Sequence, residues 1–457
     1  MIHQEVSRRK FLTRTGAIVA GSMAVGVLGS WAWLTRPWEL ESFPREGKEP
    51  IKIGDLGGKT GVYYNWGRYQ TMALKLAAKE INEQGGVLGR PIQVVTEDTE
   101  LKPPVGTVKA EKLVLEDKVK AIFGAISSSV TLAVMDVTGR YKTLHFNGIS
   151  CADEMRSTKF HKYYFGCLHD TRMNAFGLVP YLVAEDMPNI SKLDPWKRAL
   201  WVKPYVFYVD YSMGQADERG FRMVYELEMK RQGKPVTYAG RSAAPLGTTD
   251  FTPWFPAIRS AKPDSLYFAF AGLDSIRGMT QLYQQGLWPK EIDIAGIACA
   301  LLEDDIPAYG SSVKRFTHVT YWASQIDTPE NKKFVDAFFK EYGTIPNIAA
   351  WPLYDAVKAW AWAVEKAGTF DSDAVVKALE GAIINTAVGK VYIRPEDHQW
   401  IYDGAIGVVD DDLKYKLVTT YDGWQAAGAP RPGYNKPIDE LYKEPWDPEK
   451  YKQEHGL

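Results

Sequence analysis

From residue 51 onward, short apolar runs alternate with amphipathic segments, and this alternation constrains the fold more than any other feature of the chain. Tyr69, Ala73 and Leu76 fall on one face of a helix, between two runs of strand length. Strands that alternate with helices predict a parallel sheet covered on both faces. In the first part of the chain, strands are expected at 51–54, 91–97, 119–123 and 144–146, with helices at 69–81, 107–117 and after 127–129.

The same alternation restarts after a break near residues 170–195 and predicts a second α/β lobe. Strands are expected at 198–202, 236–239, 265–270 and 292–297, with helices at 214–232, 252–260 and 274–285. Two long helices follow this lobe, at 329–342 and 349–367. The roughly 410 residues that follow the N-terminal segment suit two or three domains rather than one core.

Composition excludes several classes of function. A formal net charge of −1 leaves no electrostatic footprint for nucleic acid. The cysteines Cys151, Cys167 and Cys299 are too few for a disulfide framework, although a Cys151–Cys167 bridge in an oxidising compartment stays open. No cluster has metal-ligand spacing and no nucleophile motif is present, so we expect a non-enzymatic protein without metal or cofactor.

The N-terminus carries targeting information. Arg8 and Arg9 precede Phe11-Leu12 and an uncharged stretch at 16–34, a pattern that resembles a twin-arginine export signal. The alternative is an ordinary membrane helix behind a basic N-terminus. No Ala-x-Ala cleavage site follows, so residues 1–45 are either a signal or an uncleaved anchor. With either a signal or an anchor, the folded part is expected in the periplasm, outside the cytoplasmic membrane. A twin-arginine signal also implies the twin-arginine export machinery as a partner.

Gly58-Lys59-Thr60 follows a strand and precedes a helix, as in a nucleotide-binding P-loop. The P-loop requires a first glycine at position 53, which here is Ile53, and Gly61 interrupts the helix start. We therefore expect no nucleotide site.

Several segments in register resemble the type I periplasmic binding proteins, in the leucine-binding-protein-like subgroup of branched-chain amino acid and amide receptors of ABC importers. The matching segments are 51–54, Thr60-Gly61, Trp66-Gly67, 80–92, Glu97-Asp98, 122–124, 127–129 and 245–251. The resemblance implies two doubly wound parallel-sheet lobes, a hinge of three crossing segments near 168–172, 320–326 and 388–394, and ligand in the cleft between the lobes. It divides the chain into lobe 1 (51–170 and 325–390), lobe 2 (171–322 and 391–424) and a Pro-rich tail (425–457).

Three serines are the first candidate ligand residues. Ser127, Ser128 and Ser129 precede a helix, and hydroxyls together with the first helical amides suit a carboxylate or carbonyl oxygen. N-capping alone is the competing explanation. The resemblance places Trp66 over the ligand side chain, with Tyr63 beside it.

Other candidate positions depart from the amino acid receptors. The loop that includes Ile149 ends in Cys151, where those receptors have a hydroxyl, and Ala298 stands where they have an acid for the α-ammonium. Ala271 and Gly272 replace larger side chains and suggest room for a bulkier ligand. These departures favour an aromatic, amide-like or cationic molecule over a plain amino acid.

The resemblance predicts a receptor that captures a small polar or amphipathic solute and delivers it to the membrane permease subunits of an ABC transporter. The alternative is a sensor that signals through a membrane partner, which an uncleaved anchor would favour. His169-Asp170, near the first crossing, is either a ligand contact or a hinge hydrogen bond.

Overall fold

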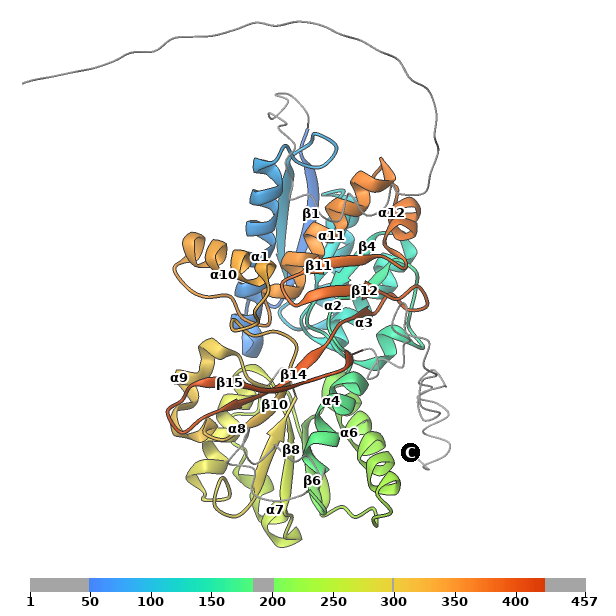
Figure 1. Ribbon diagram of the computed structural model, residues 1–457. Helices are drawn as coiled ribbons and strands as arrows, with labels where there is room; N and C mark the ends of the chain where they lie inside the picture. Colours follow the sequence, from blue (N-terminus) through green and yellow to red (C-terminus); the bar gives the residue numbers. More distant parts are fainter. Residues whose placement is uncertain (1–48, 184–200, 298–299, 424–457) are drawn as a thin grey trace, which may run out of the picture. The chain divides into compact units, whose positions relative to one another are not determined.

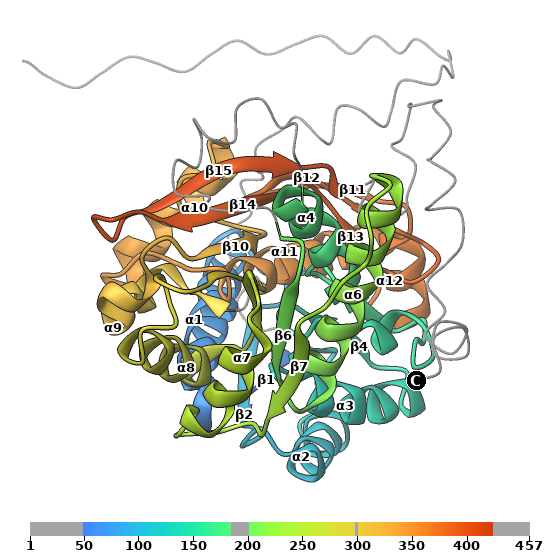
Figure 2. The same ribbon diagram turned by 90° about the horizontal axis from the view of Figure 1, so that it is seen from below.

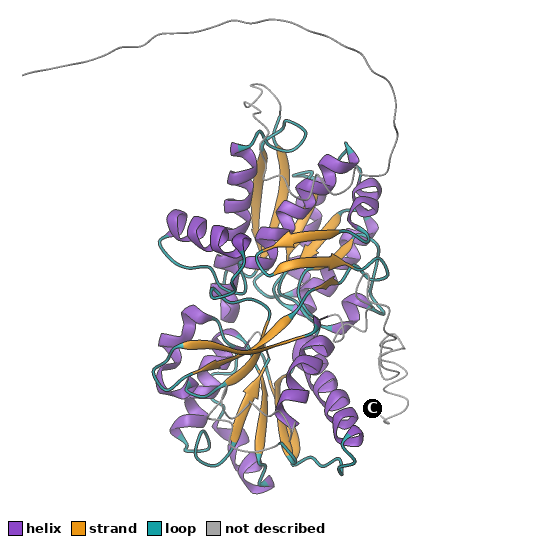
Figure 3. Cartoon of the chain, in the orientation of Figure 1, coloured by secondary structure: helices purple, strands orange, loops and turns teal. Residues whose placement is uncertain are grey.

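The protein is described here by a computed structural model that places residues 49–183, 201–297 and 300–423 (Figure 1). The expected signal or anchor (1–45), the tail (425–457) and Ala298 lie outside these ranges. Two sheets with parallel cores are present, each flanked by helices, together with a small third sheet (Figure 3). The predicted α/β class with two parallel-sheet lobes is confirmed.

The first sheet is entirely parallel and has the strand order β2-β1-β3-β4-β5. Its strands are β1 (Ile51–Gly57), β2 (Ile92–Asp98), β3 (Ala121–Gly124), β4 (Leu144–Asn147) and β5 (Tyr164–Gly166). β3, β4 and β5 are buried along their whole length, as expected for strands covered on both faces.

Helices from two distant parts of the chain cover this sheet. They are α1 (Tyr64–Glu83), α2 (Pro103–Leu115), α3 (Ser128–Arg140), α10 (Pro329–Tyr342), α11 (Trp351–Ala367) and α12 (Ser372–Leu379). α1 packs on α11, and the predicted face of Tyr69, Ala73 and Leu76 is buried. Gly86 ends the turn after α1 with φ +77°, and a Cβ there would lie 2.1 Å from the carbonyl oxygen of Arg90.

The second sheet has the order β15-β14-β10-β9-β8-β6-β7, parallel except at β10–β14 and β14–β15. Its strands are β6 (Pro204–Val209), β7 (Gly240–Ala244), β8 (Ser265–Ala269), β9 (Asp293–Gly296), β10 (Thr317–Thr320), β14 (Gly404–Val409) and β15 (Tyr415–Tyr421). The helices of this lobe are α4 (Thr171–Val183), α6 (Ser212–Arg231), α7 (Phe255–Ala261), α8 (Gly272–Gln284) and α9 (Ile306–Tyr309). Figure 2 shows β14 and β15 side by side as a long hairpin.

Three expectations for this lobe were wrong. The strand expected at 198–202 is β6, at Pro204–Val209, because a proline can occupy the first position of a strand and does not end it. The strand expected at 236–239 is the edge strand β7, whose sequence Gly-Arg-Ser-Ala-Ala carries little apolar signal. The break expected near 170–195 begins with α4, which contains Pro180 and so lacked a recognisable helical pattern.

A third sheet, β11 (Ile383–Thr386), β12 (Gly389–Ile393) and β13 (Trp400–Ile401), was not anticipated. It contacts the first lobe, since Gln399 forms a parallel β-bridge with Gly166 of β5. The chain therefore enters the second sheet only at β14, about ten residues later than the third crossing expected at 388–394.

Candidate functional site

A small cavity lies between the two lobes, at the carboxyl ends of their parallel strands. Each of its walls follows one strand: β1, β3 and β4 in the first sheet, and β6 and β8 in the second. The lining residues are Tyr63, Trp66, Ile126, Ser128, Ile149, Ser150, Tyr211, Met213 and Ala271. Open α/β sheets bind their ligands at this edge. In this form the space between the walls is about 10 Å³, roughly the room of one water molecule.

The cavity brings together part of the predicted set. Tyr63, Trp66, Ser128, Ile149 and Ala271 line it. Their expected companions Ser127, Ser129, Cys151 and Gly272 are sequence neighbours that do not line it, and Ala298 lies outside the described residues.

Sequence reasoning missed Ile126, Ser150, Tyr211 and Met213. Tyr211 and Met213 follow β6 directly, so the misplaced strand concealed them. The position of β6 was the signal that could have identified them.

The helix α3 begins at the cavity wall. Ser127 is its N-cap residue in extended conformation, and its carbonyl accepts the first helical bond from Thr131 N–H at 2.9 Å. No side chain caps this end, and within the described chain the Ser128 hydroxyl has no hydrogen-bond partner. N-capping by a serine side chain, the competing explanation, is therefore absent, and the first amides of α3 are not used by a cap.

A buried asparagine fixes the two loops of the first lobe that form the cavity. The Asn147 amide nitrogen donates to the carbonyls of Gly124 (3.0 Å) and Ala125 (2.7 Å), and its oxygen accepts from Ile149 N–H (3.1 Å) and Ser150 N–H (2.7 Å). Since one side chain joins the β3 and β4 loops, Ser128 and Ile149 are held in a fixed relation.

Aromatic residues form the opposite side of the cavity. Trp66 is 2% exposed, and its indole Nε1–H has no hydrogen-bond partner among the described residues. The hydroxyls of Tyr63 and Tyr211, one from each lobe, lie 2.9 Å apart, and Tyr211 also donates to the Met213 sulfur at 3.4 Å. Tyr64, by contrast, is exposed.

The extra room expected beside Gly272 is absent. A Cβ at this position would lie 2.5 Å from the carbonyl oxygen of Val62 and 2.7 Å from the Tyr63 ring. Gly272, with φ +57°, therefore permits close approach of the two lobes, and the space beside it is filled by protein.

Cys151 and Cys167 are both buried, and no disulfide joins them in the described structure. Burial raises the pKa of the Cys167 thiol well above its usual value. Neither residue lines the cavity.

Lys59, the apparent P-loop lysine, is engaged in internal contacts. Its ammonium forms an ion pair with buried Asp55 at 2.8 Å and donates to Thr71 at 2.6 Å. This agrees with the expectation that the Gly58-Lys59-Thr60 segment is not a nucleotide site.

His169 forms hydrogen bonds within the hinge region. One ring nitrogen donates to the Tyr402 carbonyl at 3.0 Å, and the other accepts from the Tyr421 hydroxyl at 3.0 Å. Burial lowers the pKa of His169 to about 3, so the imidazole stays neutral. Of the two alternatives, the structure supports the hinge hydrogen bond.

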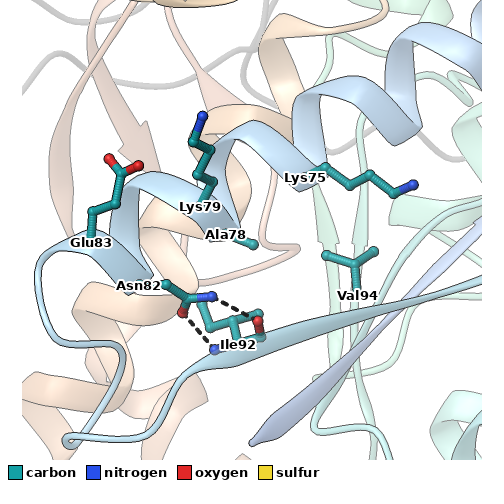
Figure 4. A pocket seen from close by; sticks show the side chains of 7 residues that line it. All are labelled: Lys75, Ala78, Lys79, Asn82, Glu83, Ile92 and Val94. Carbon is teal, nitrogen blue, oxygen red and sulfur yellow. Dashed lines mark hydrogen bonds between the residues drawn. The ribbon is translucent and has the colours of Figure 1, made fainter. Parts of the chain in front are cut away.

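A second hollow lies on the outer surface, between α1 and the edge strand β2 (Figure 4). Lys75, Lys79 and Glu83 surround it. At its base the Asn82 side chain bonds both the N–H (2.6 Å) and the carbonyl (2.9 Å) of Ile92. Asn82, which belongs to the segment 80–92 that resembles the family, thus holds β2 in place and has a structural role.

Among the described residues, no group of three or more His, Cys, Asp or Glu side chains could hold a metal ion. None of the described helices is both long enough and apolar enough for a bilayer.

Comparison with known proteins agrees with this architecture. The sequence model of a family described as "Periplasmic binding protein" matches residues 50–414. The "Leu/Ile/Val-binding protein homolog 7" of Brucella suis biovar 1 is 26% identical over 380 residues, covering 81% of this chain and 91% of that protein.

Two solved structures show the same fold. A periplasmic binding protein from Burkholderia mallei has a TM-score of 0.72 at 24% identity and covers 83% of this chain and 96% of its own. The solute binding protein of an ABC transporter from Rhodopseudomonas palustris BisB5 was solved in complex with 3,4-dihydroxy benzoic acid. It has a TM-score of 0.70 at 20% identity, and the match covers 82% of this chain and 98% of that one.

Proposed function

This chain belongs to the periplasmic binding protein family, and from this premise we propose that it captures a small solute between its two lobes and delivers it to the permease subunits of an ABC transporter. The family is non-enzymatic and extracytoplasmic. The observation that carries the proposal is the cavity itself, because five parallel strands from both sheets end at it.

The contacts around the cavity support closure of the lobes over a ligand. The Tyr63–Tyr211 pair joins the lobes at the cavity, and a Glu154–Arg219 ion pair of 2.6 Å joins them elsewhere. A receptor of this kind closes about a hinge and presents the closed form to its partner.

The N-terminal segment extends the proposal to cellular location. Arg8 and Arg9 before the apolar stretch support export of the folded chain to the periplasm by the twin-arginine machinery, with the segment either cleaved or retained as a tether.

The names of the relatives give the range of solutes to be tested. The Brucella suis relative is named for leucine, isoleucine and valine, and the Rhodopseudomonas palustris structure holds an aromatic acid. We propose that this protein takes a ligand from the classes of amino acids and aromatic acids.

A thermal-shift screen of the full-length chain against amino acids, amides, aromatic and aliphatic acids and amines tests the function. A ligand at 1,000 times its dissociation constant stabilises the native state by about 4 kcal/mol. No shift with any solute would refute the receptor function.

Calorimetry on two serine variants tests the site. Ser128→Ala removes the unbonded hydroxyl of the cavity wall, and we expect about tenfold weaker binding. Ser129→Ala, one residue away and outside the cavity, is the matched control and should bind normally. Equal affinities of the two variants would remove Ser128 from the site.

A further inference from the structure

The electrostatic character of the cavity comes from helix ends. α3, α6 and α8 all begin at its wall, since their N-caps Ser127, Tyr211 and Ala271 are lining residues or their direct neighbours. None of these three ends has a side-chain cap. Each helix N-terminus carries a partial positive charge of about half a unit, and the three ends share one small cavity.

Two of these three helix ends have no acidic side chain beside them, and no acidic side chain among the described residues lines the cavity. The first turns of α3 and α6 contain no acidic residue. Asp274, in the first turn of α8, accepts from Gly247 N–H at 2.7 Å and lies near Arg277. Every lining residue is uncharged.

Among the residues that line the cavity, an ammonium group would therefore find no carboxylate. The acids that could substitute for the one missing at Ala298 are used elsewhere: Glu303 accepts from the Ser324 hydroxyl, and Asp304 accepts from Asn65 and Asn347. A buried ammonium without a counterion is strongly unfavourable, and helix N-termini repel cations.

A second, independent feature points to an anion. The Trp66 Nε1–H lines the same cavity, almost fully buried, with no acceptor among the described residues. Buried donors of this type normally have an acceptor. The Ser128 hydroxyl is a further unbonded polar group on the facing wall.

The remaining walls suit an apolar body. Ile126, Ile149 and Met213 are aliphatic, and the rings of Tyr63 and Tyr211 complete the surface.

Resting on the receptor function proposed above, we infer that the site selects a small monocarboxylate with an aromatic or branched aliphatic body and no α-ammonium group. The carboxylate lies at the α3 N-terminus and Ser128, within reach of the Trp66 N–H. This choice separates the aromatic acids from the amino acids and rejects the cationic ligands that the departures from the amino acid receptors also suggested.

Calorimetry with matched pairs on the full-length protein tests the ligand class. The pairs are 4-methylpentanoate with leucine, 3-phenylpropanoate with phenylalanine, and benzoate with benzamide. We expect each carboxylate without ammonium to bind about 100-fold or more tightly than its partner. Leucine or phenylalanine binding as tightly as its des-amino analogue overturns the ligand class and leaves the receptor function intact. Absence of any response across the whole solute screen overturns both.

A tryptophan pair tests the proposed donor. Trp66→Phe keeps an aromatic ring in the cavity and removes the N–H, so affinity for the tightest carboxylate should fall about tenfold. Trp254→Phe also loses one indole hydrogen bond, to the Ala243 carbonyl, but Trp254 does not line the cavity, so this variant should leave affinity unchanged. Unchanged affinity in Trp66→Phe overturns the assignment of Trp66 as a donor to the ligand.

Discussion

Outside the cavity, four polar side chains join the lobes, and we call them the latch: Asn65, Asn347, Asp304 and Asp305. Asn65 lies in the first turn of α1, and its amide donates to Asp304 at 3.1 Å and to Asp305 at 2.9 Å in the second lobe. Asn347, before α11, donates to Asp304 at 2.8 Å. Since none of the four lines the cavity, we predict that Asn65→Ala weakens ligand binding without touching the ligand.

The size of the effect follows from the two bonds lost. A hydrogen bond to a charged group contributes about 1.5–3 kcal/mol when buried, and the partly exposed latch reduces this. We take about 2 kcal/mol for the pair. If the unliganded protein is mainly open, the whole loss falls on the closed, ligand-bound form, and affinity drops about 30-fold.

The assay combines calorimetry with thermal melting. Asn65→Ala should bind about 30-fold more weakly and melt almost normally, because each lobe keeps its own core. Asn82→Ala, at the other end of the same helix, is the control: it breaks the two bonds to Ile92 within one lobe and should lower the melting temperature with normal affinity. Normal affinity in Asn65→Ala would refute the idea that the latch contributes to closure.

Three further predictions test the same structure. Burial, and after it the charge of Asp304, raises the pKa of Asp305 to about 7 in the closed form, so closure takes up a proton. The affinity for ligand should therefore fall by up to about tenfold per pH unit from pH 5 to 7 and level off above pH 7. In pH-dependent calorimetry, Asp305→Asn should remove this slope. Gly272→Ala places a Cβ against Val62 and should weaken ligand binding at least about tenfold. The control is Gly286→Ala, which has φ +73° and no atom within 4 Å: it carries similar backbone strain and should only lower stability by about 1 kcal/mol. Equal affinities of the two variants would contradict the close approach at Gly272. Asn147→Ala should lower the free energy of unfolding, measured in urea, by about 3 kcal/mol. Asn385 is exposed, so Asn385→Ala should lower it by less than about 0.5 kcal/mol. A small loss in both variants would show that the Asn147 hydrogen bonds do not stabilise the fold.

How much of this site the sequence predicts depends on how local each contact is. Ser128 was identified because three serines precede a helix, and Ile149 because its loop resembles that of the amino acid receptors. Both loops follow short, fully buried strands, β3 and β4. Tyr211 was missed because β6 begins with Pro204, and the error of a few residues moved the strand end away from it. The α/β class follows from the alternation of strand-like and helix-like segments, and errors of a few residues in their positions do not change it.

Contacts between distant residues left no signal in the sequence. Asn65 and Asp304 are 239 positions apart, and nothing about either residue indicates that they meet. Gly272 was interpreted as open space because its neighbour Val62 belongs to the other lobe. Both cases depend on how the two lobes are placed, which periodicity and local propensity do not encode.

The separation of latch and cavity has a consequence for specificity. Closure is common to every ligand, so a latch variant should weaken all ligands by one factor and leave their ratios unchanged. A cavity variant such as Trp66→Phe removes a donor that only an acceptor-bearing ligand uses, so it should change the ratio between benzoate and benzamide. If Asn65→Ala changed that ratio instead, the latch and the cavity would be one coupled network, and the affinity of this receptor could not be divided into a closing part and a recognition part.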